Sequence, residues 1–363
     1  QVSAILHGGL PVSSEPMLAS TLGRVVALFA TTLFLGKEGI AQTAFTLSLI
    51  PIGGFGVRML LRERAMGPRS VAIASITYGT FALMMFAFSI GNFGSIVILA
   101  GLPYFVRALS NRKSRQAGIS AGLMIAFSPS AIIVCAVISG IYIAIGERSA
   151  SDGKPTSLMQ DYNGRTKAAF MAIFIAAVLN VGLLIDSIRN IDRNTFGLNV
   201  SIDNMTDYFF SNINVTIATY VGIAICACAL IVGRHERTSE LRVLVVSTSI
   251  LAAFAMMSIQ FAQPIFDVST LYVVLQLCVA IGVGVGIHSF ADEMKLRSFG
   301  VFHFATIFSI AGVLLSLLLS LPVLVDGSFG LPQRSWSNQI EAIENERVLY
   351  VGDAQAVPGR QVL

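Results

Sequence analysis

The sequence predicts an all-α membrane protein, a polytopic bundle of about ten transmembrane helices. Hydrophobic residues make up 55% of the chain and charged residues only 12%, and the mean hydropathy is +0.76. Soluble domains carry roughly 25% charged residues. Apolar runs long enough to cross a bilayer as helices recur as far as residue 325. Basic residues gather between these runs, which is typical of cytoplasmic loops. We therefore expect membrane lipids as partners and no nucleic acid.

Residues 39–70 set the orientation of the chain. The run of apolar or small residues 40–61 within this stretch ends among four arginines, Arg58, Arg62, Arg64 and Arg69. Arginines at the end of a span mark its cytoplasmic side, because positively charged loops stay in the cytosol. Later loops are assigned to a side by counting crossings from this point.

Residues 1–38 have two possible placements. The polar segment 1–16 leads into an apolar run, 17–36, that carries Arg24. If this run spans the membrane, the N-terminus is cytoplasmic; if it lies along the interface, the N-terminus is outside. The internal charge and the short turn into the next span favour an interfacial helix. We therefore expect an extracytoplasmic or interfacial entry segment over residues 1–38.

Residues 70–90 and 94–109 are predicted to form a hairpin of two spans with its tip outside. The loop after the hairpin holds four basic residues, Arg107, Arg112, Lys113 and Arg115. This loop is therefore placed on the cytoplasmic side, like the arginines that follow the preceding span.

The apolar run 117–146 is too long for one ordinary span and short for two. It is interrupted by Ser128-Pro129-Ser130, and the basic segment after it, residues 147–167, lies inside only if the run crosses twice. We therefore predict two short helices that break at Pro129. The freed backbone groups require cover by protein or by a water-filled cavity, and we expect a cavity near the break.

The remaining spans are predicted at residues 167–185, 213–232, 241–262, 268–289 and 302–325. They place the polar segment 186–212 outside the membrane, together with both ends of the chain. The transmembrane bundle then covers residues 39–325. Residues 326–363 are polar, and 347–353 resemble a short buried strand. We expect residues 326–363 to begin a C-terminal extracytoplasmic domain that contains β-structure.

The sequence contains no nucleotide-binding loop, zinc spacing, nucleophile elbow or catalytic triad. No catalytic residue, metal or cofactor is therefore predicted. The four cysteines lie inside apolar runs and are interpreted as small buried side chains rather than as disulfides or metal ligands. They are Cys135, Cys226, Cys228 and Cys278.

Several glycines also lie inside predicted spans, where small residues let helices approach closely. They are Gly53, Gly54, Gly282, Gly284 and Gly286. His288 and His303 lie near inner helix ends. We expect these histidines to reach the interface or to hydrogen-bond a neighbouring helix, although an ionisable residue at membrane depth can also have a functional role.

The topology places a set of charged residues on the outer side of the membrane. Acids can act as general bases, and arginines can hold a phosphate or pyrophosphate through paired hydrogen bonds, so this face suits an anionic lipid-linked donor. A solvated loop is the alternative, and spacing alone favours it. The set is Glu15, Lys37, Glu38, Asp186, Arg189, Asp192 and Arg193.

The segment His7-Gly8-Gly9-Leu10-Pro11, with Leu33-Phe34-Leu35-Gly36-Lys37, resembles the outer entry and following helix of GT-C-type membrane glycosyltransferases. Further pieces, in the same order, resemble the membrane region of large actinobacterial proteins that carry a family 2 glycosyltransferase domain. These pieces are Ile50-Pro51-Ile52-Gly53-Gly54, Ala100-Gly101-Leu102-Pro103-Tyr104 with Arg107, Ala126-Phe127-Ser128-Pro129, Ser298-Phe299-Gly300 and Arg347-Val348-Leu349-Tyr350-Val351-Gly352-Asp353.

This resemblance implies a bundle that faces outward and works on polyprenyl-phosphate-linked sugars in cell-envelope polysaccharide assembly. The family 2 domain, and the outer loop that carries the catalytic acid in GT-C enzymes, are not matched in this chain. We therefore expect a fragment whose missing N-terminal part supplies the base, with the donor phosphate held by Arg189 or Arg193. The alternatives are a transporter or lipid-linked oligosaccharide flippase, whose path the broken run would line, and a membrane scaffold without chemistry. Transporters usually show repeated halves, and none is visible here.

Overall fold

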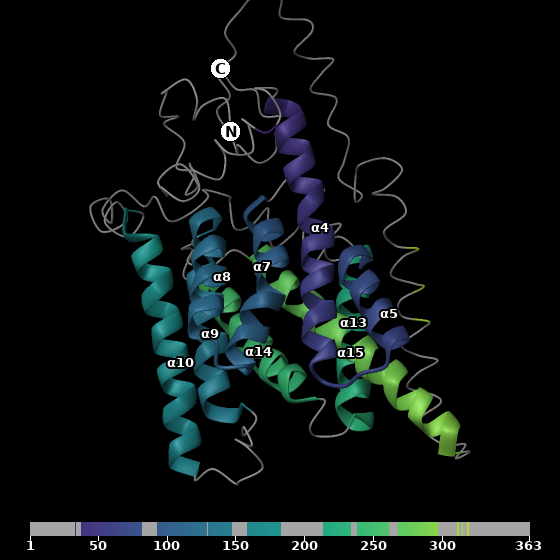
Figure 1. Cartoon of the computed structure of the whole chain (residues 1–363). Coiled ribbons are helices and arrows are strands. Elements are labelled where there is room, and N and C mark those ends of the chain that lie inside the picture. The colour runs from purple at the N-terminus through teal and green to yellow at the C-terminus, as the bar shows by residue number, and fades with distance from the viewer. Residues whose placement is uncertain are drawn as a thin grey trace, which may run out of the picture.

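A computed structural model describes residues 38–81, 93–128, 130–146, 158–182, 213–233, 238–260 and 268–296, together with the isolated positions 33, 311, 314 and 318. All regular secondary structure in these residues is helical, which confirms the all-α prediction for this part of the chain (Figure 1). The predicted interfacial helix, the last span and the C-terminal strand lie outside the described residues, apart from those isolated positions.

Four helices follow the predicted spans to within two residues. They are α4 (Glu38–Arg62), α7 (Phe93–Ser110), α13 (Ile213–Val232) and α14 (Ser239–Gln260). The helix α5 (Pro68–Thr80) begins with a proline, whose fixed φ suits the first helical turn. It ends ten residues before the limit of the predicted span 70–90, because Phe81 has an extended backbone, so that prediction was wrong in its continuity across residue 81. The limits of α4, α7, α13 and α14 agree with the predicted spans because each of these apolar runs is bounded by polar residues or turn formers on both sides.

Two helices extend beyond their predicted limits. The helix α10 (Leu158–Leu179) begins inside the segment 147–167 that was predicted to be a loop, so that prediction was wrong from Leu158 onward. Its first turns are polar because they carry a buried ion pair, described below. The helix α15 (Val268–Leu296) likewise continues past residue 289, through a segment rich in good helix formers.

The predicted break in the run 117–146 is confirmed. The helix α8 (Ser114–Phe127) ends before an extended Ser128, and α9 (Ser130–Ile145) begins directly after Pro129, which itself lies outside the described residues. A residue before proline disfavours helical backbone, which explains the end of α8. Phe127 and Ser128 are buried, and a Cβ atom on Gly94 of α7 would lie 3.0 Å from the Ser128 Cβ. Protein therefore covers this side of the break.

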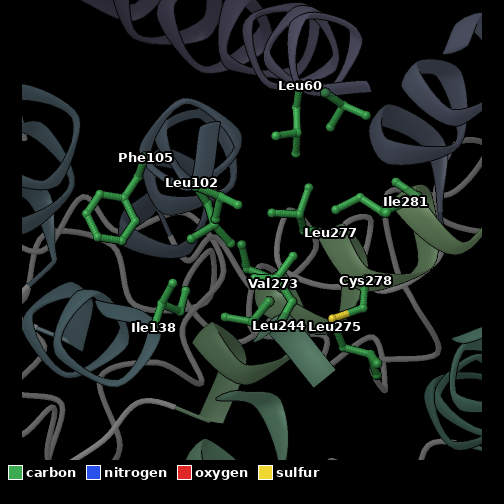
Figure 2. Packing of buried hydrophobic residues seen from close by; sticks show 14 of the residues in the cluster. Leu60, Leu102, Phe105, Ile138, Leu244, Val273, Leu275, Leu277, Cys278 and Ile281 are labelled. Carbon is green, nitrogen blue, oxygen red and sulfur yellow. The ribbon is translucent and has the colours of Figure 1, made fainter. Parts of the chain in front are cut away.

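The helix α15 is the central helix of the described bundle, because residues 273–286 are all buried and it contacts α5, α7, α13 and α14. A helix that is buried all round belongs to a core. Figure 2 shows Leu60, Leu102 and Leu244 gathered around Leu277. By length and composition, α15 is the one described helix that passes as a membrane span, over Thr270–Ser289. The number of crossings stays a prediction.

The glycine prediction is confirmed where neighbours of these residues are described. A Cβ atom on Gly53 would lie 2.9 Å from Tyr78 Cε1, and one on Gly54 would lie 3.1 Å from the Ser75 carbonyl oxygen. On α15, the same atom on Gly282 would meet Ile225 of α13, and on Gly284 it would meet Leu61 of α4. These glycines allow close helix contacts.

Candidate functional site

Of the predicted outer site residues, the structure describes only Glu38, the first residue of α4. It lies at the opposite end of α4 from Arg62. The other six, Glu15, Lys37, Asp186, Arg189, Asp192 and Arg193, lie outside the described residues. Their convergence on one site stays a prediction.

Charged side chains gather instead at the other end of the bundle, here called the basic end. It comprises the turns 62–68 and 110–114, the ends of α4, α7 and α9, and the starts of α5, α8, α10 and α14. Ion pairs and hydrogen bonds connect these segments with one another and with α15. Antiparallel neighbours place these alternating helix ends together (Figure 1). The one-sided grouping is what the predicted topology requires of the arginine-bearing turns.

Asp161 is the most deeply buried acid at the basic end, since its side chain has no exposed surface. Arg112, in the turn before α8, donates to Asp161 Oδ1. Arg165, one helical turn along α10, lies 3.2 Å from Asp161 Oδ2. Burying a carboxyl group is costly unless cations and hydrogen bonds compensate its lost hydration. Two guanidinium groups supply that compensation here.

Arg165 also binds the end of α9. Its Nη1 atom donates to the carbonyl oxygens of Tyr142, at 3.2 Å, and of Gly146, at 2.9 Å. The Tyr142 carbonyl also accepts the Gly146 N–H at 2.9 Å, so the arginine adds a second bond there. The last carbonyls of a helix carry partial negative charge, which favours a cation at this position. Arg112 precedes α8 and Gly146 follows α9, yet both meet at Asp161 and Arg165. The two short helices therefore form a hairpin that turns between Ser128 and Ser130.

Arg112 itself has an unusual backbone conformation, with φ of 55°. The Lys113 N–H donates to the Ala108 carbonyl at 2.8 Å, and the Arg112 N–H donates to Leu109 at 2.9 Å. This pair of bonds is the Schellman motif, in which the left-handed position is usually glycine. Gly164 of α10 lies under the side chain, because a Cβ atom there would be 3.0 Å from Arg112 Nη1.

A second cluster connects the α4–α5 turn with the end of α7. Arg107 Nε donates to Glu63 Oε1 at 2.8 Å, and Asn111 Nδ2 donates to Glu63 Oε2 at 2.6 Å. Burial raises the pKa of Glu63, but the hydrogen bonds from Arg107 and Asn111 outweigh burial, and the net result is a lowered pKa. Glu63 is therefore held as a carboxylate.

Two further contacts bind the α4–α5 turn to the centre of the bundle. Arg64 pairs with Glu240, a buried residue in the first turn of α14. The Gly67 N–H, just before α5, donates to His288 Nδ1 of α15 at 3.1 Å. This is the hydrogen bond to a neighbouring helix that was expected for His288. Because Nδ1 accepts, that nitrogen carries no proton. His303 lies outside the described residues.

A separate set of cations, the rim cations, faces outward at the basic end. They are Arg58, Arg62, Arg69, Arg115 and Lys167, and all five are exposed. Within the described part of the chain, none of them forms an ion pair.

Each rim cation continues an exposed apolar stripe on its helix. On α4, Leu47 and Phe55 are 56% and 53% exposed and lie on the same face as Arg58. On α10, Phe170 and Phe174 are 68% and 63% exposed and follow Lys167 at helical spacing. The stripe on α5 runs from Arg69 to Ile73 and Ile76, and that on α8 from Arg115 to Ile119 and Leu123. Exposed apolar surface on this scale indicates an interaction surface.

Cys135, Cys226 and Cys278 are buried and Cys228 is partly buried, and all four are free thiols. Among the described residues, no group of three or more His, Cys, Asp or Glu side chains is placed to hold a metal ion. Comparison of the chain with protein-family models, curated proteins and solved structures finds no match.

Proposed function

We propose that this chain is a multi-pass membrane protein. The basic end of the bundle lies on the cytoplasmic side, and the N-terminus and C-terminus of the chain lie outside. One observation carries the proposal: α4, α5, α8 and α10 each expose an apolar stripe that stops at a rim cation. Apolar stripes of this kind suit lipid acyl chains, and arginine or lysine at their ends suits the headgroup region. The inner ion pairs connect Arg64, Arg107, Arg112 and Arg165 with acids of the bundle.

Membrane embedding is tested by extracting membranes that contain the full chain with alkaline carbonate. We expect the chain to stay in the membrane pellet. Orientation is tested by single-cysteine labelling in a cysteine-free background. Cysteine at Arg115 should react with an impermeant maleimide only from the cytoplasmic side, and cysteine at Asp192 only from outside. The reverse pattern contradicts the proposed orientation, and labelling of both from one side contradicts the crossing count.

We further propose that the chain acts as the membrane part of a GT-C-like glycosyltransferase that uses polyprenyl-phosphate-linked sugars in cell-envelope polysaccharide assembly. Support comes from the order of the resembling segments and from the helical bundle. In this proposal Glu15, Lys37, Glu38 and the charged residues of 186–212 face the donor on the outer side. Arg189 and Arg193 hold its phosphate.

The donor site is tested with the full chain in nanodiscs and a polyprenyl-phosphate sugar. We expect the double variant Arg189→Gln/Arg193→Gln to bind the donor at least tenfold more weakly, since two charge-assisted contacts are lost. The matched variant Arg189→Lys/Arg193→Lys keeps the charge and should lose less. Unchanged binding in the glutamine variant contradicts the donor site.

The alternative function is a transporter or flippase whose path is lined by the broken run 117–146. The contacts at the break favour a packed structure there, because buried Phe127 and Ser128 meet the first turn of α7. Phe127 also packs on Phe45, with ring centroids 6.3 Å apart. We therefore keep the glycosyltransferase as the preferred proposal.

A further inference from the structure

We propose that the rim cations bind the phosphate groups of acidic phospholipids, so that the basic end carries a ring of bound anionic lipid. This inference rests on the proposed membrane embedding. It adds a partner of stated chemistry, a phosphodiester lipid without a compensating positive headgroup.

Apart from Lys113 and Arg242, the described cations of the basic end divide into two groups with different partners. Arg64, Arg107, Arg112 and Arg165 point to acids of the bundle, namely Glu240, Glu63 and Asp161. The rim cations have no such partner within the described residues. Among the described residues, the inner arginines therefore compensate the acids of this end, and no acid is paired with the rim cations.

The position of the rim cations favours lipid phosphate over other anions. Arg58 and Arg62 follow Phe55 along the outward face of α4, and Lys167 precedes Phe170 on α10. Their long stems can lie along hydrocarbon while their charged groups reach the headgroups. Guanidinium groups bind phosphate oxygens through paired hydrogen bonds, and four of the five rim cations are arginines. A cation near an anionic surface contributes about fivefold in affinity.

The test uses the purified full chain in phosphatidylcholine nanodiscs, titrated with fluorescent phosphatidylglycerol. We expect Arg62→Gln/Arg69→Gln to weaken binding about 25-fold, from about fivefold for each cation. The matched variant Arg62→Lys/Arg69→Lys should stay within about threefold of the native chain, because the charges remain. Asn163→Gln, at an exposed neutral position of the same end, should bind like the native chain. Raising the salt concentration should weaken binding by the native chain.

Several outcomes overturn the inference. They are native-like binding by Arg62→Gln/Arg69→Gln, equal affinity for fluorescent phosphatidylcholine, and an absence of salt dependence in the native chain. Displacement by inorganic phosphate at the concentration of the lipid would assign the site to free phosphate instead. Carbonate extraction separates the two proposals. A chain released from membranes contradicts the embedding itself, whereas a chain that stays in the pellet without lipid preference contradicts only the lipid ring. Because salt dependence is measured on the native chain, the test survives a variant that fails to fold.

Discussion

Arg112 closes α7 in a left-handed conformation, and its guanidinium group pairs with Asp161 at the start of α10. The left-handed conformation costs a residue with a side chain about 1–2 kcal/mol, which is why glycine usually takes this place. The structure joins this backbone cost to a buried ion pair that only a long cationic side chain can form. The turn after α7 therefore positions two helices at once, α8 through the chain and α10 through the side chain.

Replacing Arg112 should separate these two effects. Arg112→Ala loses the ion pair but keeps the backbone cost, and we expect a destabilisation of about 3 kcal/mol, the lower range for breaking a buried pair. Arg112→Gly loses the same pair but relieves the left-handed strain, so it should be about 1 kcal/mol more stable than the alanine variant. Thermal unfolding in detergent measures both. If the alanine and glycine variants are equally stable, the left-handed backbone at position 112 carries no cost, which contradicts the prediction.

Asp161→Asn tests the buried acid directly. The amide leaves the guanidinium groups of Arg112 and Arg165 without a counter-charge, and we expect a loss of about 3 kcal/mol in unfolding free energy. Asn163→Ala, two residues away on the exposed side of α10, is the control and should change stability by less than about 0.5 kcal/mol. Similar losses in both variants indicate that the start of α10 is generally sensitive rather than dependent on the ion pair.

The sequence predicted the helices well where composition changes sharply. The limits of α13 coincide with a run that has polar neighbours on both sides, and Pro129 predicts the break because proline forces its predecessor out of the helical conformation. The start of α10 could not be predicted in this way, because polarity between two apolar runs normally indicates a loop. Here the polar residues are helical, and two of them, Asp161 and Arg165, are buried and paired with each other.

At the basic end, too, the sequence predicts only part of the arrangement. Counting arginines predicts that these turns lie together, and the described turns do share one end of the bundle, but every arginine contributes equally to such a count. Which of them turn inward depends on acids far away in sequence, such as Glu240 for Arg64 and Asp161 for Arg112. The local spacing of Asp161 and Arg165, four residues apart, was the one available signal, since such pairs share a helix face.

The lowered pKa of Glu63 predicts how stability changes in acid. A carboxyl whose pKa is lower in the folded state stabilises the protein above its unfolded pKa, near 4.5, and this contribution is lost as pH falls through the folded value. The native chain should therefore be more stable than Glu63→Gln at pH 7, and the difference should shrink below pH about 4.5. This difference in stability is measured from the unfolding temperatures of the native chain and of Glu63→Gln between pH 7 and pH 3. A difference that is constant with pH excludes the carboxylate as its cause.

The close contact between α8 and α10 predicts opposite effects for two Gly→Ala substitutions. A Cβ atom on Gly118 would lie 2.6 Å from Ile175 Cβ and 3.0 Å from the Ala172 carbonyl oxygen, whereas one on Gly140 of α9 would meet nothing within 4 Å. Gly118→Ala should therefore destabilise the bundle by about 1–3 kcal/mol, because the helices must separate. Gly140→Ala should stabilise it by up to about 1 kcal/mol through helix propensity alone. Unfolding in detergent compares the two, and equal stabilities contradict the packing of α8 on α10.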